Sequence, residues 1–213
     1  MYKYLLFDLD GTLTDPGIGI TNSVIYALRK FDIEVGDRSA LYGFIGPPLK
    51  DSFKKYYGFS DEQSDLAIMY YREYFRKQGI FENELYDGIH DLLIKLKAKG
   101  KTLIVATSKP EVFALEILRH FELYDYFDFV AGATMNDVRN KKADIIKYAL
   151  ENCNISDKSS AIMIGDRERD ITGANLNGLD SIGVLFGYGT CDELKNAGAS
   201  FIADSPMDIL KYV

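Results

Sequence analysis

Apolar and polar positions form alternating blocks along the chain after Gly88. Short apolar runs, typical of buried strands, are interleaved with segments in which apolar residues recur every three or four positions, which is helical spacing. The predicted strands are 102–107, 127–131, 161–164, 181–185 and 201–203, and the predicted helices are 89–99, 111–121, 143–152 and 170–176. This alternation indicates an α/β fold, a parallel sheet with helices on both faces and ligands at the carboxyl ends of its strands.

The segment 16–84 has a different pattern, with no convincing strand. Its spacing predicts helices over 18–31, 38–44, 50–57 and 61–77. Because it follows the first apolar run of the chain, we interpret it as an insertion into the α/β fold. The expected domains are therefore an α/β core of residues 1–15 and 85–213 and an inserted helical domain of residues 16–84.

Composition narrows the class of protein. The 213 residues are 47% hydrophobic and 27% charged, which is ordinary for a soluble globular protein. The net charge of −7 argues against a nucleic-acid partner. Cys153 and Cys191 form no CxxC pair, so neither a redox nor a zinc site is expected. With no signal peptide recognised and no apolar run near membrane length, we expect a cytoplasmic protein without a membrane partner, either monomer or homodimer.

The first apolar run ends in two carboxylates one residue apart, Asp8 and Asp10, followed by Gly11. Two such carboxylates repel each other unless a cation lies between them, and a hard cation with oxygen ligands, most simply Mg²⁺, would relieve that cost. One Asp could then attack an electrophile while the other handles a proton. The alternative is an Asp-rich turn that only closes a loop. An EF-hand is excluded, since its sixth and twelfth positions would be Leu13 and Gly19.

Three later segments place polar side chains at or near strand ends. Thr107 and Ser108 follow an apolar strand and open a helix, where hydroxyl and backbone N–H groups favour an anion, although Ser108 could simply cap the helix. Lys141 and Lys142 precede the helix 143–152, and at least one of them is a solvated surface residue. A further apolar run ends in Gly-Asp at Asp166, and a second carboxylate, Asp170, follows four residues later; both could be acids at a helix N-terminus.

Together these segments resemble the motifs of the haloacid dehalogenase (HAD) superfamily, most of whose members are Mg²⁺-dependent phosphatases. The Asp8-x-Asp10-Gly11-Thr12 spacing resembles its first motif, and the other three segments follow in the family order, over essentially the whole chain. The match at Lys142 is loose because no Pro follows. The resemblance implies a Rossmann-like core with a helical cap over the active site.

The resemblance also implies roles for individual residues. Asp8 would attack phosphorus to form an aspartyl-phosphate, and Asp10 would act as general acid and then general base. The phosphoryl group would be bound by Gly11, Thr12, Thr107, Ser108 and Lys142, with Thr107 and Lys142 preferred over their neighbours. Mg²⁺ would be held by Asp8, Asp10 through its carbonyl, and Asp166, with Asp170 in support from the next shell. In the cap, Gly46, Lys50 and Arg72 are candidate substrate contacts.

The implied activity is hydrolysis of a small phosphorylated metabolite. The glycine-rich tail at 183–189 and 197–199 resembles the phosphoglycolate phosphatase-like branch, which also holds 5′-nucleotidases and pyrophosphatases. We therefore expect a phosphatase acting on phosphoglycolate or a nucleoside 5′-monophosphate. A pyrophosphatase, a sugar phosphomutase or a catalytically idle binding protein on the same fold remain alternatives. The second acid, Asp10, argues against a dehalogenase or a phosphonate hydrolase, which lack it.

Overall fold

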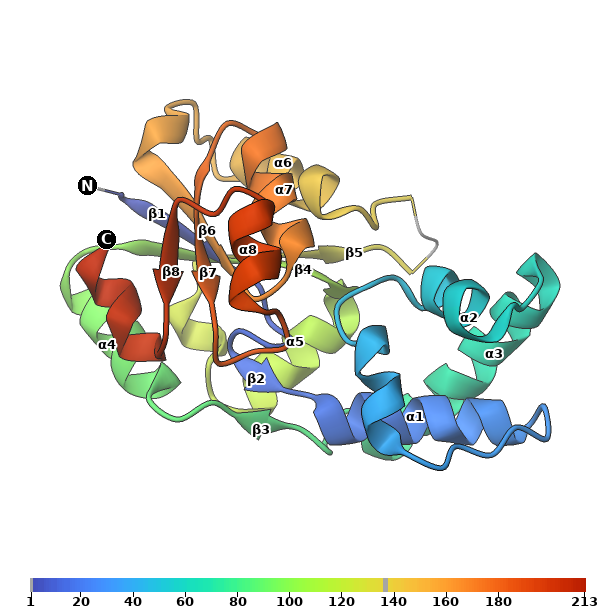
Figure 1. Ribbon diagram of the computed structural model, residues 1–213. Coiled ribbons are helices and arrows are strands. Elements are labelled where there is room, and N and C mark those ends of the chain that lie inside the picture. The colour runs from blue at the N-terminus through green and yellow to red at the C-terminus, as the bar shows by residue number, and fades with distance from the viewer. Residues whose placement is uncertain (1, 136–137) are drawn as a thin grey trace. The chain divides into compact units, whose positions relative to one another are not determined.

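The computed structural model describes residues 2–135 and 138–213. The chain divides into two compact units, an α/β unit of Met1–Thr14 and Leu85–Val213 and a helical unit of Asp15–Glu84 (Figure 1). The assignment of the helical unit as a cap stays a prediction. No helix in the described ranges combines the length and apolarity that a membrane crossing requires.

The α/β unit is built on a parallel sheet, so the predicted fold class is confirmed. Within the described residues the strand order is β5-β4-β1-β6-β7-β8. The strands are β1 (Tyr4–Phe7), β4 (Thr102–Pro110), β5 (Phe129–Ala133), β6 (Ala161–Gly165), β7 (Asp180–Val184) and β8 (Phe201–Ala203). The helices are α4 (Ile89–Ala98), α5 (Glu111–His120), α6 (Lys142–Asn152), α7 (Glu168–Leu176) and α8 (Cys191–Asn196), with short 3₁₀ turns at Tyr124–Tyr126, Lys158–Ser160 and Pro206–Lys211.

The strand order places β1 at a topological switch point. From β1 the sheet extends through β4 to β5 on one side, and through β6, β7 and β8 on the other. The connections that leave β1 and β6 run in opposite directions along the sheet, and their helices cover opposite faces (Figure 1). This arrangement opens a crevice at the carboxyl ends of these two strands. Any chemistry carried by residues directly after β1 therefore lies where such sheets bind ligands.

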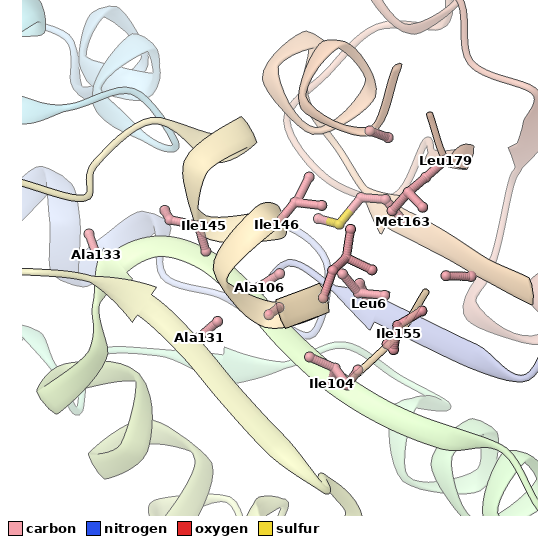
Figure 2. Packing of buried hydrophobic residues seen from close by; sticks show 14 residues of the cluster. Leu6, Ile104, Ala106, Ala131, Ala133, Ile145, Ile146, Ile155, Met163 and Leu179 are labelled. Carbon is pink, nitrogen blue, oxygen red and sulfur yellow. The ribbon is translucent and has the colours of Figure 1, made fainter. Parts of the chain in front are cut away.

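The core consists of two apolar layers on the two faces of the sheet. Leu6 of β1 is level with Ile104 of β4 and Met163 of β6, and these side chains pack under α6 with Ile145 and Ile146 (Figure 2). Figure 1 shows α6 and α7 on this face and α4 and α5 on the other. Because the strands are buried on both faces, they are continuous apolar runs in the sequence rather than alternating ones.

Several element boundaries differ from the sequence prediction. Strand β5 begins at Phe129 rather than at residue 127, because the Phe127 N–H donates back to the Tyr124 carbonyl of a 3₁₀ turn and the Asp128 side chain, not its backbone, accepts from the Leu103 N–H. Helix α8 was not predicted, although Thr190 caps it by accepting a hydrogen bond from the Glu193 N–H at 3.1 Å. A Thr followed three residues later by Glu is the signal that would have indicated this helix start.

The helical unit contains α1 (Gly17–Arg29), α2 (Leu49–Tyr57) and α3 (Asp61–Tyr74), as the periodicity indicated. The predicted helix 38–44 is a 3₁₀ helix, Arg38–Phe44, capped by Asp37. The predicted helix 61–77 continues past α3 as a π-helix, Phe75–Gly79. Aromatic rings fill the interior, where Phe53 lies 5.1 Å from Phe44 and 5.7 Å from Phe59 between centroids. Two short strands, β2 (Thr14–Asp15) and β3 (Glu84–Leu85), pair with each other.

Candidate active site

Asp8 follows β1 directly and is held in one orientation. Its N–H donates to the Ile164 carbonyl of β6 at 2.9 Å, which continues the pairing of the two strands by one residue. Its Oδ1 accepts from the Leu9 N–H at 2.8 Å, and its Oδ2 lies 2.8 Å from the Lys142 Nζ. The side chain is buried, so this carboxylate is fixed before any ligand arrives.

The turn after Asp8 requires glycine at position 11. Gly11 has a φ of 81°, in the left-handed region, and a Cβ added there would lie 2.2 Å from Oδ2 of Asp166. Thr12 is fully buried, and no protein group within the described residues accepts or donates a hydrogen bond at its Oγ1. The turn thus brings the backbone at Gly11 against the side chain of Asp166.

Three buried carboxylates, those of Asp8, Asp166 and Asp170, form a group with one oxygen of each within 4.8 Å of the others. Oδ2 of Asp166 accepts from the Tyr188 N–H at 2.8 Å, whereas its Oδ1 is buried without a hydrogen-bond partner in the described part of the chain. Oδ2 of Asp170 accepts from the Arg167 N–H at 3.0 Å. The sequence prediction placed Asp170 in support of the metal ligands; its carboxylate belongs to the same buried group, and its role stays a prediction.

Burial governs the protonation of this acidic group. Burial, with the charges of Asp170 and Asp8 adding to it, raises the pKa of Asp166 well above its usual range. Burial also raises the pKa of Asp170 to about 6, against the opposing effect of Lys142. The three carboxylates offer only oxygen ligands, they repel one another, and Oδ1 of Asp166 lacks a hydrogen-bond partner among the described residues. These properties fit a hard divalent cation, whose positive charge would offset the repulsion.

Lys142 joins this group as the first residue of α6. Its Nζ lies 2.7 Å from Oδ1 of Asp170 and donates to the Ala106 carbonyl at 3.0 Å, in addition to its contact with Asp8. Burial lowers the pKa of Lys142, but the two carboxylates more than compensate, so its pKa lies above the usual value and it stays an ammonium. Lys141 is exposed, so the geometry distinguishes the two lysines.

The segment after the apolar part of β4 lies at the same edge of the sheet. Thr107 is buried next to Ala106, and its Oγ1 accepts from the Lys109 N–H at 3.2 Å. Ser108 is half-buried. Helix α5 begins after Pro110 without a side-chain cap, so Ser108 is not the helix cap that the alternative interpretation proposed.

Lys109 was not among the predicted site residues, yet it reaches Asp10. Its Nζ lies 2.6 Å from Oδ2 of Asp10, and both side chains are nearly enclosed. Burial raises the pKa of Asp10 while Lys109 lowers it, with a net rise. The pairing of β4 with β5 is irregular between Ala106 and Pro110, so strand alternation in the sequence could not have indicated where the Lys109 side chain lies.

A glycine-rich loop after β7 also contacts the site. A Cβ on Gly187 would lie 2.2 Å from the Gly11 carbonyl, and one on Gly189 would lie 1.9 Å from the Asp166 carbonyl. Between them, the Tyr188 N–H holds Asp166. In the sequence this loop was recognised only as a glycine-rich tail that resembles one branch of the family. A local sequence pattern does not indicate which distant part of the backbone lies against a glycine.

The remaining predicted residues belong to the helical unit. Gly46 has a φ of 99°, Lys50 forms ion pairs with Asp61 at 3.1 Å and Asp65 at 2.7 Å, and Arg72 is a half-buried residue of α3. Their role as substrate contacts stays a prediction.

A parallel sheet that brings buried acids and two buried lysines together at the carboxyl ends of β1, β4 and β6 defines an α/β enzyme for phosphoryl chemistry. The model of the family described as haloacid dehalogenase-like hydrolase matches residues 5–184, and the chain belongs to this family. The family prediction is confirmed, and the protein is a phosphatase that acts on phosphoric monoesters.

Individual relatives are similar over nearly the whole chain. A 5′-nucleotidase of Pseudomonas aeruginosa is 45% identical over 91% of this chain and 87% of its own length. Tyrosine-protein kinase PtkA of Mycobacterium tuberculosis is 35% identical over 94% of this chain and 68% of its own. The crystal structure of a predicted phosphatase from Clostridium acetobutylicum has a TM-score of 0.96 and 54% identity, covering 100% of this chain and 98% of the other.

Proposed function

We propose that this phosphatase is Mg²⁺-dependent and hydrolyses a nucleoside 5′-monophosphate through an aspartyl-phosphate on Asp8. The observation that carries the mechanism is the fixed Asp8 carboxylate, which lies 2.8 Å from the Lys142 ammonium and has the carboxylates of Asp166 and Asp170 within 4.8 Å. The similarity to a 5′-nucleotidase supports the choice of substrate.

The proposed Mg²⁺ would be held by the side chains of Asp8 and Asp166 and by the carbonyl of Asp10. Asp170 lies within reach of the same group and balances the charge of Lys142. Bound there, the ion would screen the repulsion between the Asp8 carboxylate and the dianionic phosphate.

In the first step, an oxygen of Asp8 forms a bond to phosphorus and the ester P–O bond breaks. Asp10 gives its proton to the leaving oxygen, which departs as the nucleoside hydroxyl. In the second step, a water loses a proton to Asp10 and bonds to the same phosphorus, and the bond to Asp8 breaks. Phosphate is released, and both acids return to their starting states.

The phosphoryl oxygens gain negative charge in both steps. Lys142 and the Thr107 hydroxyl, with the Thr12 hydroxyl of the turn at Gly11, are the groups we assign to these oxygens; the backbone N–H groups of Gly11 and Thr12 already donate to the carbonyls of Thr14 and Leu9. Donors fixed in a water-excluded site stabilise developing charge without reorganising, which is where most of the rate advantage would arise. The cap contacts assigned from the sequence, Lys50 among them, would select the nucleoside part.

The test is phosphate release from a panel of nucleoside 5′-monophosphates, phosphoglycolate, pyrophosphate and sugar phosphates, with Mg²⁺ and with a chelator. We expect nucleoside monophosphates to be the best substrates, and Asp8→Asn to abolish turnover while the exposed Asp125→Asn does not. When a reaction with ³²P-labelled substrate is quenched with acid, the wild-type protein should carry the label and the Asp8→Asn protein should not. Preference for phosphoglycolate or pyrophosphate would refute the substrate, and Mg²⁺-independent turnover or a labelled Asp8→Asn would refute the mechanism.

A further inference from the structure

Lys109 stands out because a lysine this buried is rare. Its side chain is 5% exposed, and that of Asp10, its ion-pair partner, is 11% exposed. Removing two charges from water costs several kcal/mol per ion, and replacing such a pair with apolar residues is often neutral or stabilising. Fold stability alone therefore does not explain why an ion pair occupies this position at the edge of the active site.

The ion pair with Lys109 uses only one of the two oxygens of the Asp10 carboxyl group. Oδ2 lies 2.6 Å from the Lys109 Nζ, whereas Oδ1 is buried and has no hydrogen-bond partner within the described residues. A carboxyl group held by one oxygen cannot rotate freely about its side-chain bonds. The contact therefore leaves Oδ1 as the oxygen that is available to carry and deliver a proton.

The backbone fixes Lys109 relative to another site residue. Lys109 and Thr107 are two positions apart in β4, both are buried, and the residue between them is half-buried. The pairing of this segment with β5 is irregular between Ala106 and Pro110, and both side chains are nevertheless buried. The 3.2 Å hydrogen bond from the Lys109 N–H to the Thr107 Oγ1 connects them further. Any shift of Lys109 would consequently be resisted by the segment that also carries Thr107.

We propose that Lys109 is the positioning residue for Asp10 and fixes it for proton transfer to the leaving group. The inference rests on the acid–base role of Asp10 in the proposed function. In the first step the proton passes from Oδ1 of Asp10 to the leaving oxygen as the ester P–O bond breaks. The carboxylate that remains keeps its negative charge next to the Lys109 ammonium, and in the second step it takes a proton back from water.

This role predicts that the effect of losing Lys109 depends on the leaving group. A nucleoside alkoxide is strongly basic and needs a proton as it leaves, whereas p-nitrophenolate is weakly basic and leaves without one. A residue that acts through Asp10 therefore matters for the first substrate and little for the second. A lysine that binds the phosphoryl group instead would matter equally for both, because both substrates carry the same phosphate.

The experiment measures kcat/KM for adenosine 5′-monophosphate and p-nitrophenyl phosphate, because this ratio reports the step in which the leaving group departs. For Lys109→Met and for Asp10→Asn we expect losses of about 10²–10⁴ with the nucleotide, the usual range for acid–base catalysis. With p-nitrophenyl phosphate the loss should stay under roughly tenfold. The double variant should lose no more than Asp10→Asn, and Lys109→Arg should restore part of the nucleotide activity.

The matched control is Lys101→Met. Lys101 is also buried, lies just before the opposite end of β4, and donates from its Nζ to the Tyr2 carbonyl at 2.6 Å. Its loss should lower stability but should not change the ratio between the two substrates. If Lys109→Met does not fold, the double variant, whose pair carries no charge, and Lys109→Arg supply the comparison.

Equal losses on both substrates in Lys109→Met, alongside a leaving-group-dependent loss in Asp10→Asn, would overturn the inference and leave the proposed function standing. A further loss in the double variant beyond Asp10→Asn would also overturn it. Equal losses in Asp10→Asn itself would overturn both the acid role of Asp10 and the role of Lys109. Failure of Asp8→Asn to abolish turnover identifies failure of the proposed function separately.

Discussion

Replacing Asp166 with Asn should stabilise the metal-free protein while removing its metal site. The variant keeps the size of the side chain and an oxygen that can accept from the Tyr188 N–H. It removes one of three carboxylates whose oxygens lie within 4.8 Å of one another. The raised pKa of Asp166, caused by burial and by Asp170 and Asp8, indicates that ionising this group is unfavourable without a cation.

The magnitude follows from the geometry. Two like charges about 5 Å apart at an effective dielectric constant of about 20 repel by roughly 3 kcal/mol. Lys142 is paired with both Asp8 and Asp170 and offsets part of that repulsion. We therefore expect Asp166→Asn to add about 1–2 kcal/mol to the unfolding free energy at about pH 8 in a chelator, which raises Tm by about 2–8 °C in a chain of this size.

The assay is thermal unfolding of wild type, Asp166→Asn and the exposed Asp125→Asn, each with a chelator and with millimolar Mg²⁺. Mg²⁺ at 100 times its Kd stabilises a protein that binds it by about 2.7 kcal/mol, and this shift should occur in the wild type and in Asp125→Asn only. A metal-free Asp166→Asn that melts below wild type would refute the repulsion argument. An undiminished Mg²⁺ shift in that variant would refute the assignment of Asp166 as a ligand.

Three further predictions concern the same site. Gly11→Ala should abolish turnover and the Mg²⁺-induced thermal shift, since its Cβ would lie 2.2 Å from Oδ2 of Asp166 in a turn with a φ of 81°; a variant with wild-type kcat/KM would contradict this. Lys142→Met should lower the metal-free unfolding free energy in urea by about 3–5 kcal/mol, because it leaves buried carboxylates unpaired, whereas exposed Lys141→Met should change it little; equal effects would refute the distinction. The metal-free unfolding free energy should fall by up to about 3 kcal/mol as pH rises from about 4 through about 6. The reason is that the folded state, in which the pKa of Asp170 is raised to about 6, keeps a proton that the unfolded chain has released. Urea unfolding across this range should show the fall in wild type and a smaller one in Asp170→Asn, and identical pH profiles would exclude Asp170 as its source.

Most of the fold could be predicted from the sequence because parallel strands buried on both faces appear as unmistakable apolar runs. Leu5 to Phe7 and Leu103 to Ala106 illustrate this, since all of these residues are fully buried. Short or capped elements were harder to predict. The six-residue helix α8 lacks a repeating apolar face and depends on the cap at Thr190.

The residues of the candidate site likewise include some that could be predicted from the sequence and some that could not. Residues directly after strands, such as Asp8 and Asp166, were predicted because strand ends of a parallel sheet meet at one edge. Contacts between elements left no pattern in the sequence. The pairing of Lys109 with Asp10 depends on which side chains β4 directs toward the first turn, and the choice of Lys142 over Lys141 depends on which of them the start of α6 buries. The loop at Gly187 contacts Gly11 through backbone proximity alone.

The central position of β1 has a consequence for how the protein is made. β1 precedes the other strands of its sheet along the chain, yet its two neighbours, β4 and β6, begin at Thr102 and Ala161. A growing chain therefore carries an apolar strand with an open edge until most of the protein has left the ribosome, and open edges are where chains pair wrongly with one another. Fragments that end before β6 should aggregate when expressed, whereas the full chain should not. The strand that leads directly into the proposed nucleophile is thus also a strand whose pairing is incomplete until β6 has been synthesised.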